Sequence, residues 1–292
     1  MEPTNKTLFL CGAGNLEGVH LALTVQKARR RWDRIFLLDD DPDKRGKLVL
    51  GVEVLGPFSL LAEVDPRSSE IANLVTRSSV RRWVAWGRLR KYGLPFASLI
   101  HPNVDTLGAQ LCEGITAYQN SVIGPAARLN DGSVVMVGAV AGHGSFLGRC
   151  CILAPNAVVN ARVRVGEGTY VGTGAAIMPE LTIGEWSTIG ACSAVIRDVP
   201  AGATMMGVPS KLVVSLEQKL ASEKDENLPP DVRHEMRSRL QAGAEGEAPD
   251  AFSERGAAQK PVRVAVLSAA KESWPGGNHT LEPVRGPEQA RG

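Results

Sequence analysis

One histidine in the middle of the chain has the chemistry of a general base. His143 stands in VGAVAGHGSFLG (residues 137–148), between Gly142 and Gly144. A neutral imidazole takes up a proton near neutral pH, and such a base is usually oriented by a third group. Neither chain neighbour of His143 is acidic, so nothing adjacent in sequence orients the ring. Two interpretations stay open: a catalytic base, or an exposed polar residue on a repetitive surface.

A second set of candidate residues lies near the N-terminus. Gly12, Gly14 and Gly18 have the spacing GxGxxxG, one residue longer than the dinucleotide fingerprint. Amide groups at such a strand-to-helix turn can hold a phosphate. Asp39 and Asp40 end the next expected strand, where an acid often meets a ribose or a uracil. The alternative for residues 39–41 is a helix cap and a solvated turn, and the spacing disfavours an NAD site.

The composition excludes several classes of protein. The net charge of the 292-residue chain is only +2, which argues against a dedicated nucleic-acid binder. No apolar run reaches ~18 residues, so no membrane span is expected. The start MEPTNKTLFLCGAG lacks the pattern of a signal peptide, and the five cysteines include no CxxC pair. We therefore expect a cytoplasmic protein with reduced thiols and no metal site.

Residues 7–100 predict a small α/β unit that would position the glycines and aspartates. TLFLCGAG and RIFLLDDDP are typical of buried parallel strands, and LEGVHLALTVQKARR between them predicts a helix. GVEVLGPFSLLAEV predicts an extended piece, a turn at Gly56-Pro57 and a helix. A strand near 71–76, a helix near 79–92 and a strand near 97–100 complete the alternation.

Residues 117–199 contain a six-residue repeat around His143. The positions that carry an aliphatic residue are Ile123, Leu129, Val135, Ala141, Leu147, Leu153, Val159, Val165, Val171, Ile177, Ile183, Ile189 and Val195. Four residues after each of them stands a second residue, and nearly all of these are small or β-branched. A period of six fits neither an amphipathic helix nor an ordinary strand. It predicts short flat strands joined by tight corners.

Three such strands make one triangular coil of eighteen residues, so residues eighteen apart form columns. Each coil buries its face only against the next one, as in solenoid proteins. The repeat supplies a little over four coils. We expect the glycines that follow the aliphatic positions to adopt unusual dihedral angles at the corners. They are Gly124, Gly148, Gly166, Gly172, Gly184 and Gly190.

The C-terminal residues change character again. SLEQKLASEKDENLPPDVRHEMRSRLQAG predicts two short helices broken at Pro229-Pro230. From Gly243 the chain is rich in Ala, Gly, Glu and Pro, which favours disorder. Residues 262–270 have the pattern of a single strand, but they have no evident pairing partner.

The repeat, its exit VIRDVPAGATMMGVPSKL and the preceding FLCGAGN, FLLDDDP and LIHPNV resemble the left-handed β-helix, hexapeptide-repeat acyltransferases. The two-part combination resembles in particular the sialic acid O-acetyltransferases and the bacterial UDP-amino-sugar N-acetyltransferases, over roughly residues 6–214. The resemblance implies a left-handed coil, a homotrimer, acetyl-CoA in the groove between neighbouring helices, and a sugar substrate on the N-terminal domain.

The resemblance also assigns residues. It makes His143 the general base, but the acids that usually flank the base are Gly142 and Gly144 here. A second family histidine falls on Ile152, and a common asparagine falls on Met136. The family's usual histidine after the first glycines is replaced by Asn15-Leu16 here. The candidate substrate contacts are therefore Gly12, Gly14, Asn15, Asp39 and Asp40.

The remaining candidates concern the acyl donor. The amide of Ala161, eighteen residues after His143, is a plausible oxyanion donor. GTGAA, with Gly172, Gly174 and Ala176, offers backbone amides and little side-chain bulk, and Gly190 continues it one coil on. GVPSK resembles the family segment near the nucleotide end of acetyl-CoA, where Lys211 could meet the phosphates.

Together these features predict a Rossmann-like domain (1–103), a left-handed parallel β-helix (104–214) and a helical, then disordered tail (215–292). The predicted function is acetyl-CoA-dependent O- or N-acetylation of a sugar or nucleotide-sugar in glycan biosynthesis. Two alternatives remain. One is a weakened or inactive trimeric binding or scaffold protein, and the other is transfer of a different acyl group.

Overall fold

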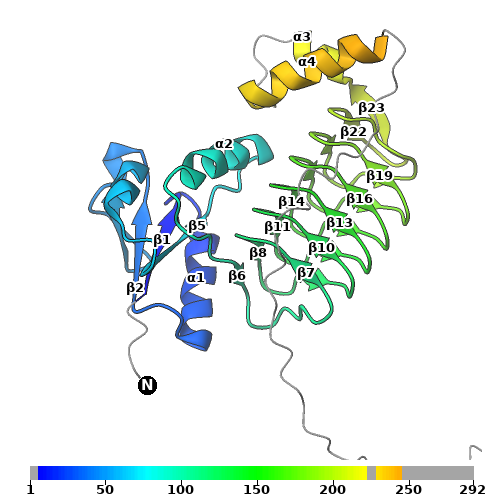
Figure 1. The fold of residues 1–292 in the computed structure, drawn as a ribbon. Coiled ribbons are helices and arrows are strands. Elements are labelled where there is room, and N and C mark those ends of the chain that lie inside the picture. Colours follow the sequence, from blue (N-terminus) through cyan, green and yellow to red (C-terminus); the bar gives the residue numbers. More distant parts are fainter. Residues whose placement is uncertain (1–5, 222–227, 245–292) are drawn as a thin grey trace, which may run out of the picture. The chain divides into compact units, whose positions relative to one another are not determined.

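The computed structural model describes residues 6–221 and 228–244, which belong to one unit of the chain, Met1–Val262 (Figure 1). The predicted strand at 262–270 and the expected disordered tail beyond residue 244 lie outside the described residues. Two parts precede a short C-terminal helical segment: an α/β sheet and a stack of short parallel strands (Figure 1).

The N-terminal part is a five-stranded sheet with the order β3-β4-β2-β1-β5. Its pairs are parallel except β3 with β4. The strands are β1 (Thr7–Cys11), β2 (Arg34–Leu38), β3 (Leu48–Val49), β4 (Val52–Gly56) and β5 (Ser69–Asn73). The helices are α1 (Leu16–Arg29), α2 (Ser79–Arg90) and two 3-10 turns, η1 (Pro42–Lys44) and η2 (Phe58–Glu63).

The predicted alternation is present with two local differences. The helix expected after Gly56-Pro57 is the 3-10 segment η2, and no side chain caps its N-terminus. The strand expected near 71–76 begins earlier, at Ser69, because that whole stretch pairs with β1. Helix α1 starts as predicted, since the Asn15 side chain caps it by accepting a hydrogen bond from the Gly18 amide.

Fifteen two-residue strands, spaced six residues apart, stack into three faces that we name after their first strands. The β7 face holds β7 (Gln110–Leu111), β10 (Arg128–Leu129), β13 (Phe146–Leu147), β16 (Arg164–Val165) and β19 (Thr182–Ile183). The β9 face holds β9 (Val122–Ile123), β12 (Val140–Ala141), β15 (Val158–Val159), β18 (Ala176–Ile177) and β21 (Ala194–Val195). The β8 face holds β8 (Thr116–Ala117), β11 (Val134–Val135), β14 (Ile152–Leu153), β17 (Tyr170–Val171) and β20 (Thr188–Ile189).

The stack fits a left-handed β-helix, and its register is the predicted one. Val140 pairs with Val122 on one side and Val158 on the other, eighteen residues away in each direction. Five strands on each face make five coils rather than a little over four, because the repeat already begins at β7. Strand β6 (Leu99–Ile100) extends the β8 face at one end, and β22 (Thr204–Met206) with β23 (Lys211–Val214) extends it at the other.

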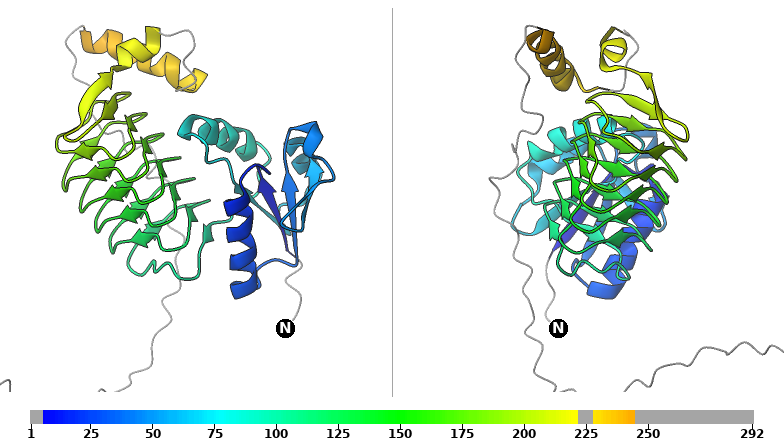
Figure 2. Two further views of the ribbon diagram at one scale, coloured as in Figure 1. Left: turned by 180° about the vertical axis from the view of Figure 1, so that it is seen from behind. Right: turned by 90° about the vertical axis from the view of Figure 1, so that its right-hand side faces the viewer.

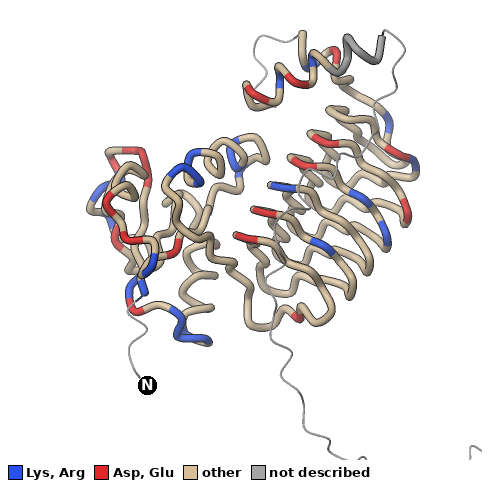
Figure 3. Tube along the Cα trace, in the orientation of Figure 1, with Lys and Arg blue, Asp and Glu red and all other residues tan. Residues whose placement is uncertain are grey.

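The interior confirms the two predicted sets of inward side chains. All thirteen aliphatic positions of the repeat belong to one buried cluster, and residues of the second set, such as Ala157 and Val163, complete it. Charged residues lie on the corners and outer surfaces of the coils (Figure 3). Each coil is therefore stabilised by apolar contacts with the coils above and below it.

The expected corner role of the glycines is wrong. The glycines after the aliphatic positions have no left-handed backbone, whereas the left-handed residues come two positions later, for example Gly144 with φ 63°. What requires glycine is the next coil: a Cβ on Gly148 would lie 2.4 Å from the amide nitrogen of Glu167. The coils thus approach too closely at this position for any side chain.

The β8 face is covered by the N-terminal part of the chain. Val134 and Ile152 on this face are fully buried in a cluster with residues of α1 and the N-terminal sheet. The two parts are also joined by Arg82 of α2, which is fully buried and donates hydrogen bonds to carbonyls on both sides, including those of Asn73 and Gly132. Burial lowers the pKa of this guanidinium.

The C-terminal segment forms the two predicted helices, α3 (Leu216–Ala221) and α4 (Pro230–Ala244), and α4 begins at the predicted proline break. They lie beyond the last coils, beside β22 and β23 (Figure 2). Leu220, Leu228, Val232 and Met236 form a buried cluster with Trp186 of the β-helix. This packing explains why the segment folds although its sequence is strongly polar.

Candidate functional site

His143 lies in the corner between β12 and β13, and its side chain is exposed as predicted. Its carbonyl accepts a hydrogen bond from the Arg162 amide at 2.9 Å. Its ring nitrogen Nε2 lies 3.1 Å from Nη1 of the same arginine. A guanidinium only donates hydrogen bonds, so this contact makes Nε2 an acceptor and assigns the proton of the neutral ring to Nδ1.

Arg162 is itself held by Glu180. Nε and Nη2 of Arg162 lie 2.9 and 2.5 Å from Oε1 of Glu180. Both side chains are more than half exposed, at 57% and 65%, so the pair contributes little to stability. Within residues 6–221 and 228–244, His143 is thus linked to a carboxylate through an arginine.

Inspection of the chain neighbours of His143 missed this contact, although the repeat carries a signal for it. Gly144, Arg162 and Glu180 are eighteen residues apart and occupy successive left-handed corner positions, with φ of 63°, 57° and 66°. A column of this kind brings residues of different coils next to one another. The residue beside a corner histidine is thus found eighteen or nineteen positions away.

The other two positions that depart from the family pattern lie away from the exposed His143 corner. Ile152 is fully buried between the β8 face and the N-terminal part, and Met136 packs against the same cluster. Their apolar character is therefore explained by burial.

The candidate acyl-donor residues fall on two different edges of the β-helix. Ala161 lies in the same kind of corner as His143, one coil on, and its amide has no hydrogen-bond partner among the described residues. Gly172 and Gly174 lie in the corner after β17, and Gly190 follows β20 on that edge. The β9 face separates the two edges, and Ala176 on it contributes a small outward side chain.

Lys211, the last candidate of this group, is exposed at the start of β23. One copy of the chain thus forms two separate groups of candidate residues. The first group is His143 with Ala161, and the second is Gly172 with Gly174 and Gly190.

The candidate substrate residues lie at the ends of β1 and β2. Gly12 has φ 114°, a conformation that favours glycine, and Gly14 has open space where a Cβ would be. The side chain of Asn15 is fully engaged: its Oδ1 accepts from Gly18, and its Nδ2 contacts the carbonyl of Leu74 and the hydroxyls of Thr76 and Tyr118. These contacts make Asn15 a positioning residue between α1 and the β8 face.

Asp39 and Asp40 are both held by local contacts. Burial alone would raise the pKa of Asp39, but hydrogen bonds from the Asp41 amide, the Lys44 ammonium and the Ala13 amide outweigh it and lower that pKa. Asp40 accepts from the Phe58 amide at 3.0 Å and pairs with Arg88 at 2.7 Å. Asp39 therefore fixes the loop after β2, as the cap interpretation expects, while Asp40 remains 40% exposed.

A cavity of about 660 Å³ brings three of the predicted residues together. Gly12, Asp39 and Asp40 line it with Phe58, Val75, five residues of α2 and three residues at the start of the C-terminal segment. The residues of α2 are Val80, Arg81, Val84, Ala85 and Arg88, and those of the C-terminal segment are Leu228, Pro230 and Arg233. The involvement of the C-terminal segment had no signal in the sequence.

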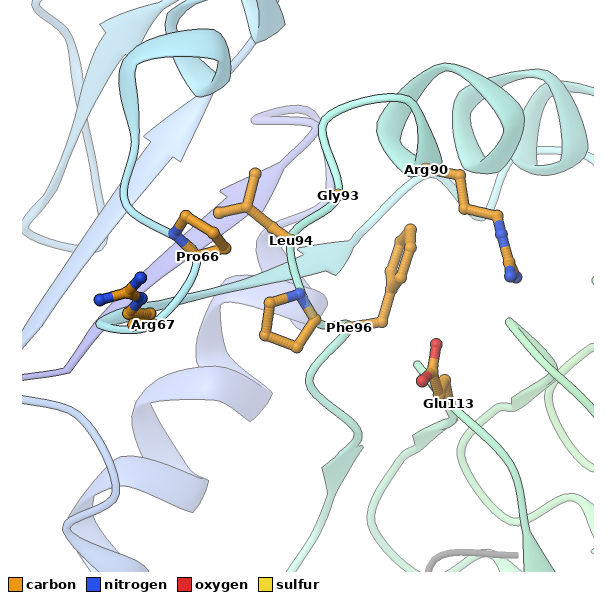
Figure 4. A pocket seen from close by; sticks show the side chains of 8 residues that line it. Pro66, Arg67, Arg90, Gly93, Leu94, Phe96 and Glu113 are labelled. Atoms are coloured by element: carbon orange, nitrogen blue, oxygen red, sulfur yellow. The ribbon is translucent and has the colours of Figure 1, made fainter. Parts of the chain in front are cut away.

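A second cavity, of about 410 Å³, contains none of the predicted residues. Figure 4 shows the ring of Phe96 beside Arg90 and Glu113, with Pro66 and Arg67 on the opposite side. Its rim combines two arginines with one acid. It contains no histidine or cysteine that would serve as a base or nucleophile.

Three of the five cysteines, Cys11, Cys150 and Cys151, are buried free thiols. Burial raises the pKa of the Cys11 and Cys151 thiols, and it raises that of Cys150 to about 12. Within residues 6–221 and 228–244, no three His, Cys, Asp or Glu side chains gather as metal ligands would. The same residues include no helix long and apolar enough to span a membrane.

Comparison with known proteins gives partial sequence matches. No family model matches the chain. It is 33% identical over 106 residues to UDP-3-O-acylglucosamine N-acyltransferase of Caulobacter sp. (strain K31), covering 36% of this chain and 29% of that protein. It is 35% identical over 66 residues to serine acetyltransferase of Bacillus subtilis (strain 168), covering 22% and 30%. The chain thus spans less than half the length of these curated relatives.

Solved structures match over nearly their whole length. The acetyltransferase domain of PglB from Neisseria gonorrhoeae FA1090, in complex with acetyl coenzyme A, is 28% identical with a TM-score of 0.65. The match covers 72% of this chain and 100% of that one. A histidine-to-asparagine mutant of perosamine N-acetyltransferase from Caulobacter crescentus, in complex with CoA and GDP-perosamine, is 26% identical with a TM-score of 0.64 and coverages of 72% and 97%.

Proposed function

Because the chain resembles the left-handed β-helix, hexapeptide-repeat sugar acetyltransferases, we propose that it is an acyltransferase that transfers acetyl from acetyl-CoA to a sugar or nucleotide-sugar. The observation that carries the proposal is the structural match, which covers 97–100% of the length of chains solved with acetyl-CoA, or with CoA and GDP-perosamine. The acceptor atom is an amine nitrogen or a hydroxyl oxygen.

In this proposal His143 is the general base. Acetyl-CoA supplies a thioester carbonyl, and Nε2 of His143 takes the proton of the attacking amine or hydroxyl. A bond from the acceptor atom to the acetyl carbon forms, the carbon–sulfur bond breaks, and His143 returns the proton to the leaving thiolate. The contact from Arg162 must open first, since it occupies Nε2 in the free chain.

The unpartnered amide of Ala161 is suited to stabilise the oxyanion that develops on the carbonyl, because it lies one coil from His143 in the same kind of corner. Gly172, Gly174 and Gly190 would leave room for the acyl donor because they have no side chain, while their amides already donate to neighbouring backbone carbonyls. Lys211 would lie near the phosphates of the donor. These two groups lie on different edges of one β-helix. A groove that uses both edges forms when two copies lie side by side, which supports a homotrimer.

We assign residues 1–103 as a Rossmann-like sugar-binding domain, 104–214 as the left-handed β-helix and 215–292 as a tail. Gly12, Gly14, Asp39 and Asp40 would contact the sugar nucleotide, and Asn15 would position the glycine turn. The mostly parallel sheet and the cavity at the ends of β1 and β2 support this assignment.

A weakened or inactive scaffold protein is the second candidate. Gly142 and Gly144 leave His143 without a direct carboxylate partner among the described residues, and the guanidinium of Arg162 occupies its acceptor nitrogen. Transfer of a different acyl group is a third possibility. It is less well supported, because burial already explains the apolar residues Ile152 and Met136.

The test is acetyl transfer by the purified chain. Acetyl-CoA is mixed with a panel of UDP- and GDP-amino sugars and sialic acids, and release of the free thiol is followed. We expect release with at least one acceptor and a loss of about 10²–10⁴-fold in His143→Ala. His20→Ala, an exposed histidine on α1, is the matched control. Release no faster in the wild type than in His143→Ala, with every acceptor, would rule out the proposal.

A further inference from the structure

The chain is longer than the solved structures that it matches, and beyond its β-helix it forms the helices α3 and α4. Those structures are matched over nearly their full length, yet the match leaves more than a quarter of this chain uncovered. The helices α3 and α4 are packed against the rest of the fold. Leu220, Leu228, Val232 and Met236 are buried against Trp186, which packs edge-on against Trp83 of α2 at 5.0 Å.

Two polar contacts define where α4 lies. Nε1 of Trp83 donates to Oδ2 of Asp231 at 3.4 Å, which joins the first turn of α4 to α2. Nη2 of Arg237 donates to the Leu220 carbonyl at 2.9 Å, which joins α4 to α3. The first turn of α4 is thereby held beside α2, on the side that borders the 660 Å³ cavity.

This position gives the cavity a wall from the C-terminal segment. Leu228, Pro230 and Arg233 line the same space as Gly12 and Asp40 of the N-terminal part. Residues more than 180 positions apart in the chain therefore form one cavity. A volume of about 660 Å³ is in the range of small-molecule sites.

The charges of the lining suit a phosphorylated ligand. Two carboxylates line the cavity, but Asp40 is paired with Arg88 and Asp39 with Lys44. Three arginines line it from two elements: Arg81 and Arg88 from α2, and Arg233 from α4. Basic residues gather on α2 (Figure 3). Guanidinium groups bind phosphate oxygens through two parallel hydrogen bonds, which makes such a cluster typical of phosphate recognition.

We propose that α4 completes the nucleotide-sugar site and that Arg233 binds the diphosphate of that substrate together with Arg81. The glycine turn at Gly12 lines the same cavity. This inference rests on the proposed function, and of the two acceptor classes named there it takes the nucleotide-sugar. It adds a specificity-determining residue from the C-terminal segment, which lies beyond the β-helix in the chain.

The experiment measures binding of UDP and GDP to the full chain by calorimetry, with acetyl-CoA as an independent ligand. We expect the wild type to bind one nucleotide. Arg233→Ala should weaken that binding by about 10- to 100-fold, the usual effect of losing a hydrogen bond between charged groups. Arg233→Lys should recover part of the loss, and Arg81→Ala should cause a similar loss. Acetyl-CoA binding should stay unchanged in every variant.

The control is His234→Ala, which alters the adjacent exposed residue of α4 and should bind the nucleotide like the wild type. Circular dichroism and the fluorescence of Trp83 and Trp186 check that α4 stays in place in Arg233→Ala. Nucleotide binding that is unchanged in Arg233→Ala would overturn the inference and leave the proposed function intact. A wild type that binds acetyl-CoA and acetylates a nucleotide-free sugar, but binds neither UDP nor GDP, would also overturn it.

Discussion

Replacing Arg162 with methionine tests whether the arginine restrains the base. Nη1 of Arg162 lies 3.1 Å from Nε2 of His143, the nitrogen that accepts the proton of the sugar in the proposed mechanism. Methionine keeps much of the apolar stem of arginine but cannot donate a hydrogen bond. If His143 is the base, the variant should therefore be faster than the wild type.

The size of the effect follows from the cost of opening this contact. A hydrogen bond contributes about 0.5–1.5 kcal/mol net. Arg162 is 57% exposed and also paired with Glu180, so the lower part of that range applies. An opening cost of about 0.5–1 kcal/mol corresponds to an increase of about 2- to 5-fold in kcat/KM for the sugar.

Thiol release from acetyl-CoA at varied sugar concentration measures the effect. Arg164→Met is the matched control, because Arg164 lies on the outer side of β16 over the ring of Phe146, and it should leave the rate unchanged. The gain from Arg162→Met should disappear when His143 is also replaced with alanine. A tenfold or larger loss in Arg162→Met would refute the reasoning, since it would mean that Arg162 assists the reaction.

Two further predictions concern stability. Gly148→Ala should lower the free energy of unfolding by about 1–3 kcal/mol, because the new Cβ would meet the Glu167 amide at 2.4 Å. Gly14→Ala, which has open space, should change it by less than about 0.5 kcal/mol. Urea unfolding measures both variants, and equal effects would contradict the close-approach argument. Asp39 has a lowered folded-state pKa, so its contribution is present above its usual pKa of 3.8 and is lost as the pH falls through the folded value. The stability difference between the wild type and Asp39→Asn should therefore shrink below about pH 4, and a difference that stays constant down to pH 2 would exclude this role.

The repeat was predictable because every coil needs the same pattern of inward aliphatic residues. An aliphatic residue every six positions fills the interior, so the buried cluster and the eighteen-residue register could be predicted from sequence. The number of coils was underestimated because the first strands, at Gln110 and Thr116, lie before the clearest hexads. The glycines were identified correctly but explained wrongly, since their requirement comes from the neighbouring coil.

The candidate site was predictable only in part. The sequence singled out His143, Gly12, Asp39 and Asp40, and the last three do share a cavity. The chain neighbours of these residues gave no sign of what surrounds them, because a contact between coils or between chain ends depends on how the chain folds. Neither the donor to His143 nor the wall formed by Arg233 follows from chain neighbours.

By itself, then, the sequence determined the repeat, the alternation of the N-terminal strands and helices, and the proline break before α4, because each depends on residues a few positions apart. Only the tertiary structure decided that Arg162 meets His143 from the next coil, and that α4 closes a cavity at the ends of β1 and β2. The physical reason is packing: stacked coils and the Trp83–Trp186 contact bring together groups that the chain order keeps apart.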